Sequence, residues 1–172
     1  MRAFLAAMAI ITVAAPALAA LPEGAKAPNF VTQGAIGGKP FKLALAEQLR
    51  HGPVVLYFYP KAFTKGCTLE AHAFSEAMPE FKAADARVIG MSADDLETLK
   101  KFSIEGCRSA FPVARADSKV IKAYDVALPA SGLTNRTSYV IARNGKIVMV
   151  HSEMDWKDHV GKSLAAVKAL KR

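Results

Sequence analysis

The order of apolar runs along the chain predicts alternating strands and helices. Residues 54–59 (Val-Val-Leu-Tyr-Phe-Tyr) form a continuous β-branched and aromatic run that ends at Pro60, which is typical of a strand covered on both faces. Shorter apolar runs predict further strands over residues 87–92, 111–114, 138–142 and 146–150.

Apolar residues at helical spacing predict the helices between these strands. The stripes are Leu69, Ala73, Phe74, Ala77, Met78 and Phe81, then Leu96, Leu99 and Phe102, then Val160, Leu164, Val167 and Leu170, with a short helix over 118–124. We expect Pro79 to kink or split the first helix, because proline removes a backbone donor and clashes with the preceding turn. Asp94 and Asp95 can cap the second helix, and Gly106 can end it.

Two glycine-containing turns predict hairpins. Gly37-Gly38 separates two short apolar pieces, and Asn144-Gly145 separates the last two predicted strands. Strands that alternate with helices and end in an antiparallel pair indicate one α/β domain.

Residues 1–19 have the pattern of a signal peptide. A basic end at Arg2 precedes an apolar run that is too short to span a bilayer, and Pro16-Ala17-Leu18-Ala19 supplies the small residues that signal peptidase accepts. The mature domain would then be residues 20–172, exported to an oxidising compartment. An uncleaved membrane anchor or a buried N-terminal helix remains as an alternative.

Composition narrows the functional classes. The 172 residues suit one domain, and the net charge of +8 is spread along the chain without a basic block, which argues against nucleic-acid binding. Two cysteines are too few for a disulfide framework, and with four scattered histidines they form no zinc-finger pattern.

Cys67 is the strongest candidate for chemistry. It follows the most hydrophobic strand and lies in the first turn of the next predicted helix, at the sheet edge where sites of α/β proteins collect. Backbone amides and the helix dipole favour a thiolate there, and the thiolate is the nucleophilic form of cysteine. Thr64 can cap this helix or donate its hydroxyl toward the sulfur.

The string Pro60-x-x-x-Thr64-x-x-Cys67 resembles the signature of the peroxiredoxins, which are thiol peroxidases. Flanking segments are similar to the Q class, also called bacterioferritin comigratory proteins. These segments are residues 57–60, 66–70, 88–92, 111–113, 116–117 and 136–141. The resemblance covers about residues 25–171 and implies a thioredoxin-like fold, with a central mixed β-sheet flanked by helices.

The resemblance also implies roles for individual residues. Cys67 would attack a hydroperoxide and become a sulfenic acid, releasing water or an alcohol. Arg136 would hold the thiolate and polarise the peroxide. Thr64 would orient the peroxide, Pro60 would shield the sulfur from water, and Glu70 would hold Arg136.

Cys107, the second cysteine, bears on how the sulfenic acid of Cys67 would be reduced after each reaction. Some Q-class members carry a resolving cysteine five residues after the first, but that position is His72 here. Others carry it near the end of the next helix. Cys107 lies in that region, so we interpret it as the resolving thiol, which forms an intramolecular disulfide after local unwinding of the Cys67 helix. A thioredoxin-like or other dithiol reductant would reopen the bond.

The implied protein is a periplasmic enzyme that needs no metal, haem or flavin. It would bind neither nucleic acid nor, once the signal is cleaved, a membrane, and it would be a monomer or weak dimer. Several alternatives remain. The cysteines could form a static disulfide, Cys107 could be a spectator in a one-cysteine enzyme, and Arg136 could be a plain surface residue. A thioredoxin-like thiol–disulfide oxidoreductase is disfavoured because the motif Cys-x-x-Cys is missing. The remaining alternative is a non-catalytic module that binds a metal or senses redox state.

Overall fold

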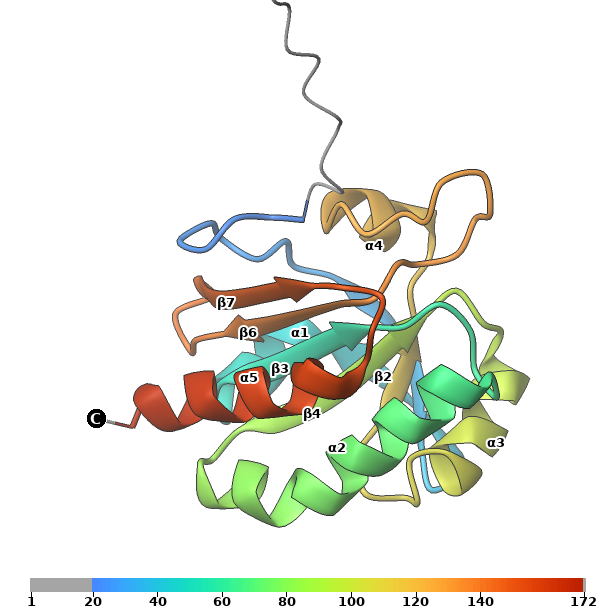
Figure 1. Ribbon diagram of the computed structural model, residues 1–172, viewed down its shortest axis with the longest axis horizontal. Helices are drawn as coiled ribbons and strands as arrows, with labels where there is room; N and C mark the ends of the chain where they lie inside the picture. Colours follow the sequence, from blue (N-terminus) through green and yellow to red (C-terminus); the bar gives the residue numbers. More distant parts are fainter. Residues whose placement is uncertain (1–19, 172) are drawn as a thin grey trace, which may run out of the picture.

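The computed structural model describes residues 20–171, so the predicted signal peptide over residues 1–19 lies outside the described part (Figure 1). One seven-stranded sheet has the order β2-β1-β5-β4-β3-β6-β7. Its strands are β1 (Val31–Ile36), β2 (Lys39–Ala44), β3 (Val54–Phe58), β4 (Arg87–Ser92), β5 (Val113–Arg115), β6 (Thr137–Ile141) and β7 (Ile147–Ser152). The helices are α1 (Leu45–Arg50), α2 (Lys65–Ala83), α3 (Leu96–Glu105), α4 (Ser118–Ala123) and α5 (Lys157–Ala169).

The sheet is mixed, as predicted. Strand β3 pairs in parallel with β4, which pairs in parallel with β5, whereas β6 joins the other edge of β3 in antiparallel register. Both predicted hairpins form. Ile36 pairs with Lys39 around Gly37 and Gly38, whose φ angles of 54° and 77° lie in the left-handed region that glycine tolerates. Gly145 similarly closes the β6–β7 turn with a φ of 81°.

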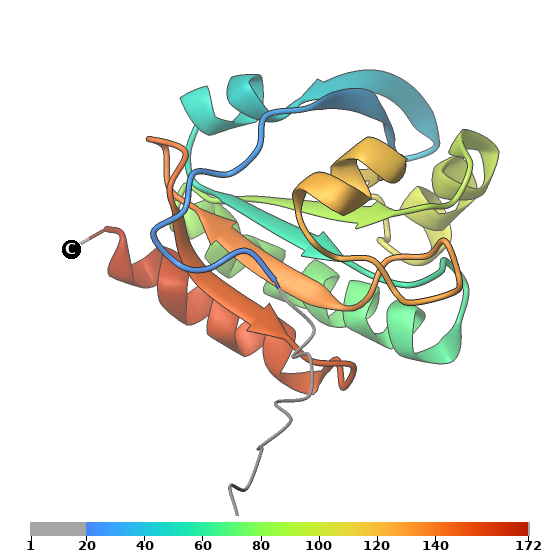
Figure 2. The ribbon, with the colours of Figure 1, turned by 90° about the horizontal axis from the view of Figure 1, so that it is seen from above.

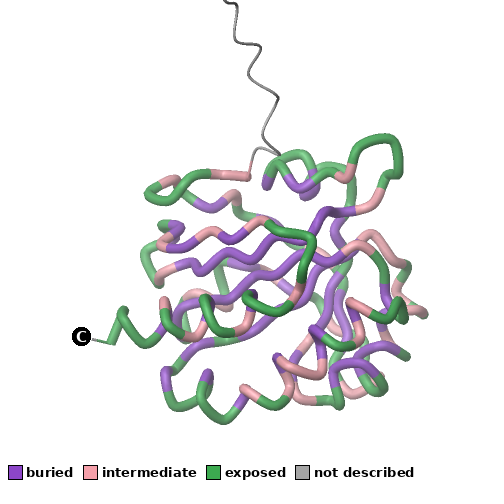
Figure 3. Tube along the Cα trace, in the orientation of Figure 1, coloured by how far each residue is buried: buried purple, intermediate pink, exposed green. Residues whose placement is uncertain are grey.

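Helices cover both faces of the sheet, and each face has its own hydrophobic core (Figure 2). Side chains alternate along β3, so Val55 and Tyr57 join the core under α2, α3 and α5, while Leu56 and Phe58 join the core under α1 and α4. Every residue of β3 is buried, and Figure 3 shows buried positions running along the central strands. This explains why the strand reads as an unbroken apolar run.

Helix α2 corrects one expectation, because it is not split at Pro79. It runs unbroken from Lys65 to Ala83 with Pro79 inside. Pro79 is exposed and lies close to the C-terminal end, while Met78 and Phe81 on either side of it are buried in the core. Their burial offsets the single backbone hydrogen bond that a proline removes.

The remaining differences concern element ends and burial. Helix α1 was not predicted. Helix α3 begins after Asp95, whose carboxylate accepts from the Thr98 amide, and Gly106 follows its last turn, as expected. Leu69 and Leu170 were expected to face the core but are 40% and 41% exposed. Within residues 20–171, no helix is long and apolar enough to cross a membrane.

Candidate active site

Cys67 lies in the first turn of α2, directly beyond the C-terminal end of β3. The first intrahelical bond runs from the Thr68 amide to the Thr64 carbonyl at 2.9 Å, so Cys67 belongs to the turn whose amides precede the helical ladder. The Cys67 side chain is 2% exposed. The sulfur is therefore largely withdrawn from water and lies near the positive end of a 19-residue helix.

Arg136 reaches the sulfur from the segment that leads into β6. Its Nη2 donates to Cys67 Sγ at 3.5 Å, its Nη1 donates to Glu70 Oε2, and its Nε donates to the Met154 carbonyl oxygen at 2.9 Å. The side chain is 5% exposed, so its charge acts where solvent screens it little. The plain surface role for Arg136 is therefore excluded.

Glu70 follows Cys67 on the same face of α2 and is fully buried. Its contact with Arg136 agrees with the expectation that it holds the arginine. Burial raises the pKa of Glu70 to about 8, and the adjacent guanidinium offsets only part of that effect. One buried cation thus faces two groups that can each carry a negative charge.

Thr64 and Pro60 lie in the segment that joins β3 to α2. Thr64 is the N-cap residue of α2 by position, but its hydroxyl makes no cap bond and instead donates to the Lys61 carbonyl oxygen at 3.0 Å. Its hydroxyl hydrogen is thus engaged within the loop, and neither the predicted cap bond nor the predicted donation to the sulfur is made. Its oxygen lone pairs remain able to accept. Pro60 is half-buried just after β3.

Phe63, in the loop between β3 and α2, has a strained backbone. Its φ is 64°, which is uncommon for a bulky residue, and its ring is 46% exposed. It packs edge-to-face on Phe102 with 5.2 Å between the ring centroids. The packing holds a large apolar side chain at the surface one residue before Thr64.

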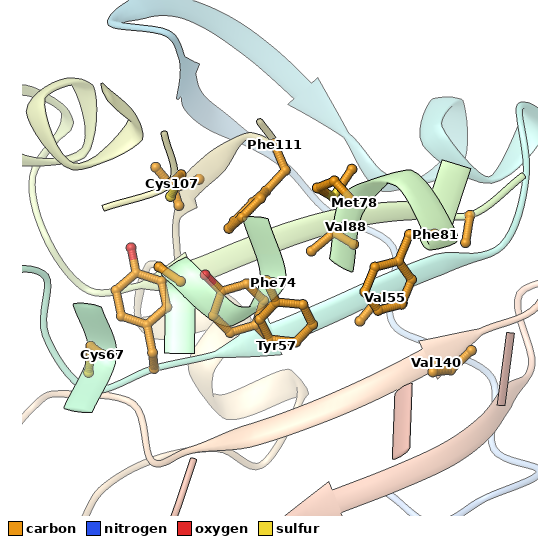
Figure 4. Close-up of a cluster of buried hydrophobic side chains, with 14 of the residues drawn as sticks. Val55, Tyr57, Cys67, Phe74, Met78, Phe81, Val88, Cys107, Phe111 and Val140 are labelled. Carbon is orange, nitrogen blue, oxygen red and sulfur yellow. The ribbon is translucent and has the colours of Figure 1, made fainter. Parts of the chain in front are cut away.

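Cys107 follows α3 and is fully buried in the same core cluster as Cys67. Both thiols are free, and Figure 4 shows them at separate places in the cluster. The Cys107 carbonyl oxygen accepts from Ser75 Oγ on α2 at 2.6 Å, and burial raises the pKa of the Cys107 thiol. A bond between the two sulfurs therefore requires local rearrangement, and the resolving role stays a prediction.

A buried histidine behind Glu70 was missed by the sequence reasoning. His159, on α5, is fully buried; its Nδ1 lies 2.8 Å from Ser138 Oγ and 3.8 Å from Glu70 Oε1, and its Nε2 lies 2.9 Å from the Glu153 carbonyl oxygen. The available signal was its spacing of four from Ser163 and eight from Val167, all buried on one face of α5. Among the residues that the structure describes, no cluster of His, Cys, Asp and Glu could hold a metal ion.

Comparisons with known proteins identify the family of this chain. The profile of the AhpC/TSA family matches residues 24–150. The chloroplastic peroxiredoxin Q of Oryza sativa subsp. japonica is 31% identical over 180 residues, covering 95% of this chain and 81% of that protein. The chloroplastic peroxiredoxin Q of Arabidopsis thaliana is 32% identical over 149 residues, covering 86% of this chain and 67% of that protein.

A solved structure extends the similarity to the fold. The crystal structure of peroxidoxin BcpB from Mycobacterium tuberculosis superposes with a TM-score of 0.76 at 33% identity, covering 87% of this chain and 98% of that one. The family profile, the relatives and the fold all indicate the same family. The chain belongs to the AhpC/TSA family as a peroxiredoxin of the Q class, or bacterioferritin comigratory type.

Proposed function

We propose that this peroxiredoxin, a thiol peroxidase, reduces hydrogen peroxide and organic hydroperoxides at Cys67. The observation that carries the proposal is the 3.5 Å contact between Arg136 Nη2 and Cys67 Sγ in a buried site. A guanidinium stays protonated at any physiological pH, so it stabilises the anionic form of the sulfur, and that form is the nucleophile.

The reaction follows from these groups. The Cys67 thiolate attacks one peroxide oxygen, an S–O bond forms, and the O–O bond breaks. The departing oxygen gains negative charge and leaves as water or an alcohol once it takes up a proton. Arg136 is placed to attract that charge as it develops, and the Thr64 hydroxyl oxygen can accept from the peroxide. Pro60 has no amide hydrogen that could compete for either oxygen.

Stopped-flow kinetics would test this step directly. Trp156, the single tryptophan, lies close to the active-site turn, since its Cδ1 is 3.9 Å from where a Cβ on Gly66 would be. Its fluorescence should change as the reduced protein meets hydrogen peroxide, at a rate proportional to peroxide concentration. Cys67→Ser should abolish the change, and Cys107→Ser should leave the first phase intact. A phase that persists in Cys67→Ser would refute the assignment.

We also propose that Cys107 resolves the sulfenic acid. Both cysteines belong to one core cluster, and the segment that carries Cys107 is attached to α2 through Ser75. Unwinding of α2 would therefore release both thiols together. Mass spectrometry after one equivalent of peroxide should find a Cys67–Cys107 bond and the loss of two hydrogens. A stable Cys67 sulfenic or sulfinic acid beside a free Cys107 would instead indicate a one-cysteine enzyme.

The working environment is the remaining part of the proposal. The signal-like residues 1–19 favour export to the periplasm, where a thioredoxin-like or other dithiol protein would reduce the disulfide. N-terminal sequencing of periplasmic protein should begin near residue 20. Light scattering of the purified mature chain should give a monomer or weak dimer. Retention of the full-length chain in the cytoplasm would contradict the export proposal.

A further inference from the structure

The second carboxyl oxygen of Glu70 poses a problem that the peroxidase mechanism leaves open. Oε2 faces Arg136, but Oε1 is buried and has no hydrogen-bond partner within residues 20–171. A buried carboxylate oxygen without a donor is costly, because it has lost water and gained nothing in exchange. The nearest polar atom given for Oε1 is His159 Nδ1, at 3.8 Å.

The hydrogen bonds of His159 determine which of its nitrogens carries a proton. Nε2 faces the Glu153 carbonyl oxygen at 2.9 Å, and a carbonyl oxygen only accepts, so Nε2 is the donor. Burial is the largest reason that the pKa of His159 falls to about 4, so the ring is neutral at pH 7. Nδ1 is then an acceptor. It accepts from the Ser138 hydroxyl at 2.8 Å and also faces Glu70.

At 3.8 Å the contact between Nδ1 and Oε1 is too long for a hydrogen bond, and the lone pair of Nδ1 already accepts from Ser138. The partial negative charge on Nδ1 nevertheless disfavours a second negative charge on the buried Oε1 that it faces. We propose that His159 is a positioning residue that keeps Glu70 a neutral acid in the reduced enzyme and so leaves the charge of Arg136 to the Cys67 thiolate. The inference rests on the proposed peroxidase function. It assigns the hydrogen to Oε1 of Glu70, which is the atom without a partner.

The charged groups around His159 keep its ring neutral, whereas the charge of Arg136 favours an ionised Glu70 and offsets part of the effect of burial. Glu70 faces Arg136 from the segment before β6 and Cys67 from its own helix, so an ionised Glu70 would compete with the thiolate for one guanidinium. His159 faces the His151 ring on β7, with 4.5 Å between centroids, and Lys162 Nζ lies 3.2 Å from His151 Nδ1. Arg136, His151 and Lys162 all disfavour a second proton on His159.

The arrangement also balances the proton count of the reaction. Attack by the thiolate forms the S–O bond, breaks the O–O bond and removes the negative charge from the sulfur. The departing oxygen needs one proton to leave as water or an alcohol. Once the sulfur is a neutral sulfenic acid, Arg136 has lost its anionic partner, so Glu70 can ionise and release one proton. The total charge of the site is the same before and after.

A double-mutant cycle on the full mature protein would test the proposal. His159→Phe keeps a ring but removes the nitrogen that faces Oε1, and it should slow the reaction with hydrogen peroxide at pH 7 several-fold, because the charge on Nδ1 acts on Oε1 through space. It should also move the pH–rate midpoint upward. In a Glu70→Gln background, where residue 70 cannot ionise, His159→Phe should shift neither. His51→Phe, at an exposed histidine that pairs with Glu47 at the end of α1, is the matched control and should match wild type.

Infrared spectroscopy would test the same point without a variant that could misfold. Reduced wild type at pH 7 should show the carbonyl band of a protonated buried carboxyl that is missing in Glu70→Gln, and oxidation of Cys67 should diminish it. An ionised Glu70 in the reduced protein, or equal slowing by His159→Phe in both backgrounds, would overturn the proposal. A wild-type protein that does not react with peroxide would instead refute the peroxidase function, whatever the infrared band shows.

Discussion

Replacing Arg136 by methionine should slow the peroxide reaction while leaving the domain folded. Methionine keeps most of the aliphatic volume but loses the donors to Cys67, Glu70 and the Met154 carbonyl. One hydrogen bond to a charged group contributes about 1.5–3 kcal/mol. The full Coulomb attraction of charges 3.5 Å apart is about 5 kcal/mol at an effective dielectric constant near 20. These limits correspond to a loss of about 10-fold to about 3,000-fold in the second-order rate constant.

The assay is stopped-flow fluorescence across pH 5–10, with urea unfolding to confirm that each variant is folded. Arg136→Lys should be intermediate, because one ammonium cannot span the same three acceptors. Arg143→Met is the matched control, since Arg143 is exposed in the β6–β7 turn and, within residues 20–171, its side chain donates only to the carbonyl oxygen of Arg50 at the end of α1. A folded Arg136→Met protein within twofold of wild type at pH 7 would refute the electrostatic role.

Three further predictions concern rearrangement and stability. Ser75→Ala removes the 2.6 Å hydrogen bond from α2 to the Cys107 carbonyl oxygen and should speed formation of the Cys67–Cys107 disulfide several-fold, measured by quenched-flow mass spectrometry. An unchanged rate would show that this hydrogen bond does not limit the rearrangement that brings the two sulfurs together. The pKa of His159 is lowered from 6.5 to about 4, so the unfolded chain takes up a proton at this residue before the folded protein does. The free energy of unfolding should therefore be highest above pH 6.5 and fall as the pH drops toward 4. Urea unfolding of His159→Phe should depend less on pH in this window. Gly52→Ala should lower the free energy of unfolding by about 2–4 kcal/mol, because the φ angle of Gly52 is 155° and the new Cβ would lie 2.0 Å from the Asp85 carbonyl oxygen. A loss below about 1 kcal/mol in calorimetry would show that the loop moves to accommodate the new atom.

Hydrophobic periodicity predicted the centre of the fold well and its periphery less well. The run at 54–59 and the Gly37-Gly38 and Asn144-Gly145 turns correspond to β3 and the two hairpins, because strand burial and tight turns leave local signals. Helix α1 has six residues and one buried side chain, Leu45, too little for a stripe to be visible. The prediction that Pro79 splits the helix was wrong, because burial of Met78 and Phe81 in the core outweighs the low helix propensity of proline.

The site shows a similar division. Cys67 was visible from its place between a strand and a helix, whereas Arg136 was identified only through resemblance, because 69 residues separate it from the sulfur. The Met154 carbonyl that holds Arg136 could not be predicted, since every residue has a carbonyl and only the fold selects one. His159 was missed because it precedes Val160 of the expected stripe, and a one-residue error turns the predicted face of a helix by about 100°.

The count of charges explains why these hidden residues matter. Cys67 and Glu70 are three residues apart, so one face of α2 presents two acids to one guanidinium. Two buried anions sharing one cation would leave a net charge in a site with little water, which is costly. One proton must therefore stay, and if it stayed on the sulfur the nucleophile would be lost. The residues that decide where it stays are His159, Ser138 and the Glu153 carbonyl, all behind Glu70 and away from the peroxide. The reactivity of Cys67 thus depends on a helix that contributes no atom to the reacting centre.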